Sequence, residues 1–343
     1  MAAYRNRRRR QQGVAIITAL LLTTLAVTIV ASLFWQQQVQ VRSMENQRLQ
    51  LQTRWILRGA LDWSRLILSQ DGRDNQLRTT LDGVWATPLA ETRLDQYIER
   101  ERAENEKFDA SLSGQITDAQ GRYNLANLAT GRAPNKLQQQ VFARLLTNLQ
   151  LDQSLAQRVA QQVALSQPAV PVPEAGTPGT PSTPGAPATP GVTPQPVAVA
   201  SNGSGEPMEL LRVEDLLAIS GFTPQAIERL RDYVIVLPRP TALNVNTAPA
   251  ELLSAAVEGL SSSEGTTLVN NRKRGGFRDM QDFKQQVQGH TVIDNNGVTV
   301  SSSFFLVLSR VKLDRATLNS QALIQREGMT NNFRTTVVWI RDN

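Results

Sequence analysis

Residues 13–32 read GVAIITALLLTTLAVTIVAS, and this stretch decides how the rest of the chain is arranged. The run Arg7–Arg10 precedes it, and no charged residue follows until Arg42. As a helix, Val14–Phe34 would be about 32 Å long, which matches the apolar core of a bilayer. Because the basic residues lie only on the N-terminal side, they stay cytoplasmic while the bulk of the chain crosses. We therefore predict a transmembrane helix over residues 14–34.

Three interpretations of this segment remain open at the level of sequence. The apolar run is longer than the roughly 7 to 15 residues of a cleaved signal peptide, and no small-x-small cleavage site with a turn follows it. Gly13 stands directly before the apolar run, with the basic residues wholly upstream. That placement favours a processed leader over residues 1–13. An uncleaved signal anchor and a conventional signal peptide are the alternatives.

Composition narrows the classes of function. The 343-residue chain has room for more than one core, and its formal charge is +6. Five arginines lie within the first ten residues, so the chain after Gly13 keeps a net charge of only +1. A nearly neutral folded part argues against nucleic acid as the partner. The absence of cysteine excludes disulfides, thiolate metal sites and thiol nucleophiles.

The apolar segment is predicted to continue as one helix into the aqueous phase. Residues 36–69 contain no proline and a single glycine, and turn-forming residues follow at Asp71–Asn75. One face of this helix is expected to pack on a sheet. The charged stretch Glu91–Lys107 predicts a second, solvated helix. The predicted packing face consists of Leu49, Ile56, Ala60, Trp63 and Ile67.

Alternating apolar and polar residues predict the strands of that sheet. Leu112–Asp118 reads as a strand that leads into a turn at Ala119–Gly121. The sequence Asp294–Gly297 suggests a hairpin turn between short strands at 292–293 and 298–300. Further strands are expected at 304–313, 322–326 and 335–340. We predict that they form a C-terminal antiparallel sheet, one face of which the long N-terminal helix covers.

The middle of the chain has a helical pattern with one interruption. Apolar spacing over 136–165 predicts two helices joined near Asp152. Residues 167–207 then hold eleven of the 17 prolines and hardly a charge, so we expect a disordered insert. The predicted fold is therefore α+β, with a large inserted all-α domain.

Two segments within this domain, Glu214–Phe222 and Glu251–Leu260, look like copies of a helix-hairpin-helix unit. Thr247 is the expected N-cap of the helix in the second copy. The motif on its own suggests binding of DNA phosphates, with charge from Arg272–Arg274. The hairpins lack the Gly-x-Gly pattern that lets backbone approach phosphate closely. A structural module is favoured, and a membrane-anchored DNA-binding protein is the alternative.

Catalytic patterns are absent from the sequence. The single histidine, His290, follows a predicted helix and is interpreted as a surface loop residue. Asp294–Gly297 has its glycine at the fourth place rather than the sixth, so we interpret it as a turn and not as a calcium loop. No acid pair, nucleophile elbow or phosphate-binding loop occurs. The chain is predicted not to be an enzyme.

Three stretches together resemble a known family. The leader with Gly13 resembles that of type IV prepilins, residues 114–124 (GQITDAQGRYN) resemble a GxIxDxxGRxN stretch, and residues 244–249 read NVNTAP. With the Gly–Gly–Phe segment that ends at Phe277, these resemble minor pseudopilin K of type II secretion. One departure from most pilins is Thr18, the fifth residue after Gly13, where a glutamate is usual. Its absence is itself a trait of the K type.

The resemblance implies most of the functional detail. A prepilin peptidase is expected to cut between Gly13 and Val14, and Val14 is then N-methylated. The implied protein is a single-pass subunit of the bacterial inner membrane, with its bulk in the periplasm. It sits at the pseudopilus tip with minor pseudopilins I and J, on the inner-membrane secretion platform. No cofactor is required, although some members bind Ca²⁺ in the helical domain, and no calcium ligands are assigned here.

The expected order of domains follows from the resemblance and the patterns together. Residues 35–122 form the pilin-like helix and first strand, and residues 123–290 form the inserted helical domain with SAM-like units. Residues 291–343 supply the C-terminal strands of the pilin-like domain.

Overall fold

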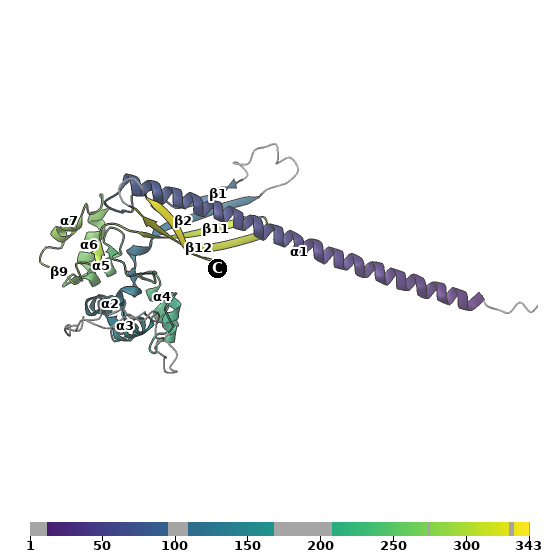
Figure 1. The fold of residues 1–343 in the computed structure, drawn as a ribbon, viewed down its shortest axis with the longest axis horizontal. Coiled ribbons are helices and arrows are strands. Elements are labelled where there is room, and N and C mark those ends of the chain that lie inside the picture. The colour runs from purple at the N-terminus through teal and green to yellow at the C-terminus, as the bar shows by residue number, and fades with distance from the viewer. Residues whose placement is uncertain (1–11, 95–108, 168–207, 274, 329–332, 343) are drawn as a thin grey trace, which may run out of the picture.

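A computed structural model describes residues 12–94, 109–167, 208–273, 275–328 and 333–342. Its dominant feature is a single helix, α1 (Gln12–Asp74), of 63 residues. Figure 1 shows that the second half of α1 lies along a sheet while the first half extends beyond it. This first half is long and apolar enough to cross a membrane. The prediction of one uninterrupted helix from the apolar segment to the turn near residue 74 is confirmed.

Hydroxyl side chains in the apolar half of α1 satisfy themselves within the helix. The Thr18 hydroxyl donates to the carbonyl oxygens of Val14 and Ala15 at 3.0 Å each. Thr23, Thr24 and Thr28 donate in the same way to carbonyls three or four residues earlier. Such bonds remove the cost of placing a hydroxyl in an apolar surrounding. The threonines therefore do not disqualify this segment as a membrane span.

The sheet has five strands in the order β1-β2-β11-β12-β13, and every neighbouring pair is antiparallel. Residues 91–93 belong to β1, so the prediction of a helix there was wrong. β1 is the edge strand and pairs with β2, with Thr92 opposite Leu112 and Arg93 opposite Ser111. Residues 95–108 of that predicted helix lie outside the described residues. The strands are β1 (Leu89–Arg93), β2 (Ala110–Asp118), β11 (Phe304–Leu313), β12 (Ala316–Glu327) and β13 (Arg334–Asp342).

One apolar core joins α1 to the sheet. Leu57, Leu61 and Leu68 of α1 are buried against Phe305 and Val307 of β11. The predicted packing face is rotated from this one, because Trp63 is exposed over 48% of its surface while Ser64 is buried. Ser64 can be buried because its hydroxyl donates to the Ala60 carbonyl at 2.8 Å.

A helical region is inserted between β2 and β11. It has its own large core, to which Phe142, Leu145 and Phe283 contribute fully buried side chains. The two helices predicted over 136–165 are confirmed as α2 and α3. The elements of the region are η4 (Ala119–Gly121), β3 (Tyr123–Asn124), η5 (Leu125–Leu128), β4 (Ala129–Thr130), β5 (Ala133–Pro134), α2 (Lys136–Asn148), α3 (Leu155–Ser166), η6 (Val213–Ala218), α4 (Pro224–Leu230), β6 (Val234–Ile235), β7 (Leu243–Asn244), α5 (Ala250–Ala256), β8 (Val257–Glu258), α6 (Ser262–Arg272), α7 (Met280–Gln286), β9 (Thr291–Val292) and β10 (Val298–Thr299).

The two predicted copies of the helix-hairpin-helix unit differ in their leading element. The first copy begins with the 3-10 helix η6 and the second with the α-helix α5. Both turns contain a glycine in the left-handed region, Gly221 at φ +103° and Gly259 at φ +79°. A residue with a Cβ atom is strained there, which explains glycine at each turn. The predicted disordered insert 167–207 lies outside the described residues except for Gln167.

The predicted hairpin at 292–300 was wrong. The turn at Asp294–Gly297 forms, but β9 pairs antiparallel with β8, and β10 pairs in parallel with β7. Val292 and Val298 are both buried in the core of the helical region. Burial of these valines against different neighbours outweighs the short-range pairing that the turn suggests. The first strand of the sheet after the helical region is therefore β11.

The helical region and the apolar half of α1 lie at opposite ends of the molecule (Figure 1). The helical region gathers beyond the end of the sheet where α1 terminates. A small cluster attaches it to the sheet face opposite α1, where Ile235 and Leu237 pack on Phe304, Leu306 and Leu323. The sheet thus has α1 on one face and the root of the helical region on the other.

We expect Leu68→Ala to destabilise the protein by about 2–5 kcal/mol, because Leu68 is fully buried between α1 and the sheet. Leu66→Ala is the matched control, since Leu66 lies on the same helix with 65% of its surface exposed. Urea denaturation of the full chain in detergent micelles, followed by tryptophan fluorescence, measures both. Equal shifts of the two midpoints would contradict the packing described here.

Candidate functional site: the polar seam between the sheet and the helical region

The stretches 114–124 and 244–249, on which the family resemblance rests, are in contact, although more than a hundred residues separate them in sequence. Asp118 ends β2, and Asn244 ends β7. Ser302 precedes β11, and Thr79 lies in the segment between α1 and β1. All four residues are buried; the side chains of Asp118, Asn244 and Ser302 hydrogen-bond to one another, and Thr79 joins them through its carbonyl oxygen and by accepting from the Ser302 backbone N–H. We call the set Thr79, Asp118, Asn244, Asn246, Thr247, Ser302 and Arg326 the polar seam.

The carboxylate of Asp118 is the centre of the seam. Its Oδ2 accepts from Ser302 Oγ at 2.6 Å, Thr247 Oγ1 at 2.6 Å and Asn244 Nδ2 at 2.9 Å, and its Oδ1 accepts from the Gln120 amide at 2.8 Å. Burial raises the pKa of Asp118, and the hydrogen bonds from its neighbours oppose that rise. The four donors compensate for removing the carboxylate from water.

Asparagines fix the segments that converge on Asp118. Asn244 Nδ2 lies within 3.1 Å of the Thr79 carbonyl, and Asn244 Oδ1 accepts from the Asn246 amide at 2.9 Å. Asn246 in turn binds the backbone of Phe277 twice, accepting from its N–H at 2.6 Å and donating to its carbonyl at 3.0 Å. This contact holds the Gly–Gly–Phe segment against the seam. Gly276 adopts φ +70°, and a Cβ atom there would lie 3.1 Å from Asn246 Oδ1.

A buried ion pair closes the seam on the side of α1. Arg326 on β12 donates to Asp71 Oδ2 at 2.7 Å, and to the carbonyl oxygens of Leu68 and Ser302 at 3.2 Å each. Its Nη2 also donates to Thr79 Oγ1 at 2.9 Å. One guanidinium therefore binds the end of α1, the segment that follows it, and the segment that enters β11. A buried charge pair is tolerated where every donor is satisfied in this way.

Two further asparagines attach the 237–241 segment to the start of the helical region. Asn124 accepts from the Leu237 amide at 3.1 Å and donates to the Arg239 carbonyl at 2.8 Å. Asn127 forms a reciprocal pair with the backbone of Thr241, at 2.7 and 2.8 Å. These amide side chains replace missing backbone partners in a region without regular strands.

Thr247 was predicted as the N-cap of α5, and this was wrong. The N-cap position is Pro249, and the Thr247 hydroxyl donates to Asp118 instead. Gly121 allows this approach, because a Cβ atom at that position would lie 2.9 Å from Thr247 Oγ1. A capping threonine and a threonine that contacts a distant carboxylate look the same in sequence.

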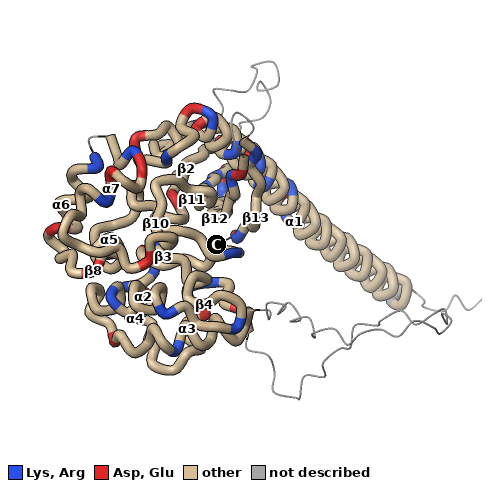
Figure 2. The backbone as a smooth tube through the Cα atoms, turned by 60° about the vertical axis from the view of Figure 1, so that its left-hand side comes forward, with Lys and Arg blue, Asp and Glu red and all other residues tan. Residues whose placement is uncertain are grey.

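The basic run after α6 does not form a phosphate-binding surface. Arg272 turns inward and donates to the carbonyl oxygens of Val245 and Ala248, and burial lowers its pKa to about 10. Lys273 donates to Asn270 Oδ1 at 3.1 Å. Arg274 lies outside the described residues. Figure 2 shows lysines and arginines spread over several elements instead of gathered at α5 and α6. The geometry gives the DNA-binding alternative no support.

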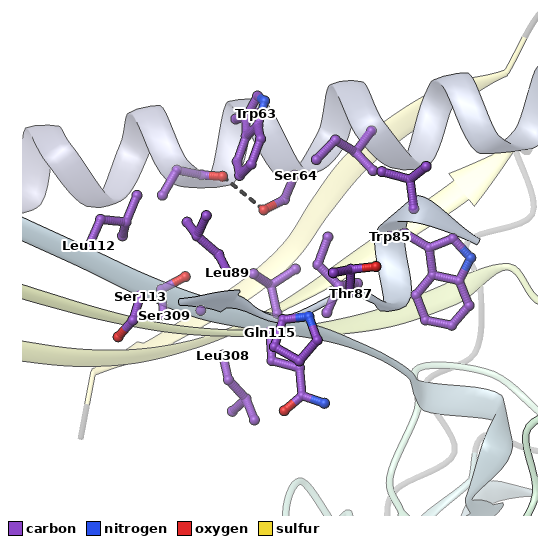
Figure 3. A pocket seen from close by; sticks show the side chains of 17 residues that line it. Trp63, Ser64, Trp85, Thr87, Leu89, Leu112, Ser113, Gln115, Leu308 and Ser309 are labelled. Atoms are coloured by element: carbon purple, nitrogen blue, oxygen red, sulfur yellow. Dashed lines mark hydrogen bonds between the residues drawn. The ribbon is translucent and has the colours of Figure 1, made fainter. Parts of the chain in front are cut away.

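An apolar groove lies between α1 and the β1 edge of the sheet, with a cavity volume of about 200 Å³. Figure 3 shows Trp63 and Ser64 on α1, with Thr87, Leu89 and Leu112 on the sheet side. Trp85 borders the groove, and its indole N–H is buried without a hydrogen-bond partner among the described residues. The groove carries no acid, base or nucleophile arranged for catalysis in the part of the chain that the structure describes.

The residues predicted for processing lie far from the seam. Gly13, Val14 and Thr18 all fall in the apolar half of α1, and the side chains of Val14 and Thr18 are exposed. In Figure 2 the end of α1 that contains Val14 and Thr18 shows no lysine, arginine, aspartate or glutamate among the described residues. His290 lies 3.4 Å from Glu264 in a bend after α7. Among the described residues, no three His, Cys, Asp or Glu side chains are grouped to hold a metal ion.

The resembling stretches contained Asp118, Asn244, Asn246 and Thr247, but sequence reasoning missed the rest of the seam. Thr79, Ser302 and Arg326 stood in no motif, and Asp71 was interpreted only as part of a turn. The signal that was available is a polar residue at the end of a predicted strand, such as Asp118 at the end of Leu112–Asp118. Such a residue marks the end of an element but does not indicate which distant residue its side chain will contact.

Comparison with known proteins identifies relatives that match most of this chain. Two family models described as type II secretion system (T2SS), protein K, match residues 121–239 and 243–301. Type II secretion system protein K of Pseudomonas aeruginosa is 30% identical over 301 residues, which cover 84% of this chain and 80% of the relative. The protein of the same name from Pectobacterium carotovorum is 24% identical over 291 residues, 81% of each chain.

A solved structure shares the fold. It is a chain of the GspK–GspI–GspJ complex from the enterotoxigenic Escherichia coli type 2 secretion system. The match has a TM-score of 0.61 at 18% identity, and covers 88% of this chain and 99% of that one. The long helix on an antiparallel sheet with a helical middle region is therefore an α+β, pilin-like fold.

We expect Asn244→Asp to destabilise the protein strongly, because the new carboxylate would lie against Asp118 Oδ2, 2.9 Å from the present amide nitrogen. Like charges raise each other's pKa, and burial already raises that of Asp118. The folded state then binds a proton that the unfolded state releases above pH ~4, so the free energy of unfolding falls as the pH rises toward neutrality.

Asn271→Asp is the control, because Asn271 is exposed at the end of α6. Urea midpoints of both variants between pH 4 and 7.5 measure the effect. An Asn244→Asp penalty that does not grow with pH would contradict the burial of Asp118 in the seam.

Proposed function

Because this chain belongs to the type II secretion system protein K family, we propose that it forms the tip of the periplasmic pseudopilus and initiates and caps its assembly. As a member of this family it is a structural minor pseudopilin and not an enzyme. The single observation that carries the proposal is the placement of the helical region at the end of the molecule opposite the apolar half of α1. A pseudopilus so capped would push folded proteins across the outer membrane.

The position of the helical region explains why assembly would stop above this subunit. Pilin-like subunits stack through their long helices, so the next subunit must pass over the far end of the sheet. Here that end carries the helical region, which is fixed by the polar seam and by Ile235 and Leu237 packed on the sheet. A region fixed at this place blocks a further subunit. The chain would thus begin a filament but not repeat along it.

Thr18 supports the same position. Its hydroxyl carries no charge, and it donates within the helix to the carbonyl oxygens of Val14 and Ala15. Thr18 therefore offers no negative charge to a neighbouring subunit. A glutamate at this place in most pilins can neutralise the terminal amine of the adjacent subunit. A subunit that lacks the carboxylate is poorly suited to the inside of a filament and tolerable at its end.

The proposed topology uses the leader and the apolar helix. A prepilin peptidase would remove residues 1–13 on the cytoplasmic side, and Val14 would become the N-methylated terminus. Residues 14–34 would span the inner membrane and residues 35–343 would lie in the periplasm. The pilin-like domain would comprise residues 35–118 and 304–343, and the inserted helical domain residues 119–303, because β9 and β10 pair with β8 and β7 and not with the sheet. The exposed apolar side chains of α1 from Val14 to Phe34 support this assignment.

The proposed partners follow from the solved relative, which forms a complex with GspI and GspJ. We assign the corresponding minor pseudopilins I and J to this chain, together with the inner-membrane secretion platform. The face of α1 turned away from the sheet supports contact with other helices, because Met44, Leu51 and Trp55 are exposed.

Processing is tested by the mass of the mature chain. We expect a mass that begins at Val14 with one added methyl group, whereas Gly13→Val should keep Met1. Gly59→Val is the control, because Gly59 lies in the same helix and a Cβ atom there meets nothing within 4 Å. A wild-type chain that keeps Met1 would contradict the proposal that the leader is cleaved after Gly13.

The tip position is tested with a single cysteine, which the chain allows because it has none. Lys284→Cys places a thiol on the exposed face of α7 in the helical region. Gold labelling of detached pseudopili should mark one end of each filament, and wild-type filaments should stay unlabelled. Label distributed along the filament would contradict capping.

A further inference from the structure

A second cavity lies where the helical region meets the sheet face opposite α1. Its volume is about 360 Å³, which is near the lower limit for small-ligand sites. Residues from the helical region line one side, and Leu306, Gln321, Trp339 and Arg341 of β11, β12 and β13 line the other. The chain's C-terminal end lies beside it, since Arg341 Nη2 donates to the Leu211 carbonyl at 2.9 Å.

Four guanidinium groups face this cavity. They belong to Arg122, Arg212, Arg231 and Arg341, and Glu214 is the one acidic residue in the lining. Glu214 lies 3.7 Å from Arg231, so its charge is already partly used. The lining therefore keeps a charge of +3 in a partly enclosed space.

Two of these arginines, Arg122 and Arg341, are partly buried, whereas Arg212 and Arg231 are exposed and Arg231 also lies 3.4 Å from Glu228. Among the described residues, the half-buried Arg122 guanidinium has Asp232 as a charged neighbour but makes no hydrogen bond. Arg341 lies over the ring of Trp339 at 3.9 Å. Burial and then the charge of Arg212 lower the pKa of Arg341, while Asp215 and Glu214 raise it. A bound anion would relieve this repulsion between positive charges.

The chemistry of the lining favours carboxylates. Guanidinium groups bind carboxylates through two parallel hydrogen bonds, and four of them can hold two such groups. Trp339, which is only partly buried, supplies apolar surface for the carbon atoms between the carboxylates. A compact inorganic phosphate would leave that surface unused.

We propose that this cavity binds a ligand with paired carboxylates and so links the helical region to the sheet. The ligand is either a free polycarboxylate or a pair of acidic side chains from a protein segment. The site goes beyond the tip function, which does not require it, and its failure would leave that function untouched.

Calorimetric titration of the full-length chain in nanodiscs of neutral lipid tests the proposal. The probes are citrate, a hexaglutamate peptide and inorganic phosphate. We expect citrate or the peptide to bind, and Arg122→Gln to weaken binding at least about tenfold, the usual cost of one charge-assisted hydrogen-bond pair. Arg334→Gln is the control, because it removes the same charge from an exposed position on β13. Thermal melting of each variant checks folding.

The outcomes separate the sources. Tighter binding of the peptide assigns the site to a protein segment, and tighter binding of citrate assigns it to a free polycarboxylate. Arg122→Lys, which keeps the charge, should retain part of the affinity. The proposal is overturned if neither carboxylate probe binds at millimolar concentration, if Arg122→Gln and Arg334→Gln weaken binding equally, or if phosphate binds as tightly as citrate.

Discussion

The buried carboxylate of Asp118 is the interaction on which the arrangement of the two parts depends. A desolvated carboxylate is costly unless donors surround it, and here the donors come from Gln120, Asn244, Thr247 and Ser302. Gln120 follows Asp118 in the chain, Asn244 and Thr247 belong to one segment of the helical region, and Ser302 lies just before β11. Moving the helical region away from the sheet would leave the charge without partners. The need to satisfy one carboxylate therefore fixes the position of the whole insert.

The seam also explains how a large insertion leaves the sheet intact. β2 and β11 are adjacent antiparallel strands, although the entire helical region lies between them in the chain. Arg326 holds the entry to β11 and the end of α1 together through Ser302 and Asp71. The helical region can then keep a separate core without drawing on the core that joins α1 to the sheet. The polar seam and the small cluster at Ile235 and Leu237 thus join the two large cores.

Local signals predicted the regular elements well and the irregular ones poorly. The long helix, α2, α3 and the strands β2, β11, β12 and β13 follow from the spacing of apolar residues along contiguous stretches of the chain. The short pairs β7–β10 and β8–β9 could not be predicted, because two-residue strands carry no periodic signal. The prediction of a hairpin around Asp294–Gly297 was wrong for that reason. A turn sequence fixes the direction of the chain and not the strands that it will join.

The sequence by itself determined the long apolar segment and the uninterrupted helix and, through motif resemblance, the pilin-like class and the family. The segment and the helix rest on composition and periodicity, and the class and the family on short motifs; all of these are properties of contiguous residues. Only the tertiary structure decided that Thr247 contacts Asp118, that Arg272 faces inward, and that four arginines surround one cavity. Those facts concern residues far apart in the chain. Hydrogen bonds and charges act over a few ångströms of space, and which residues share that space is settled only when the two cores pack.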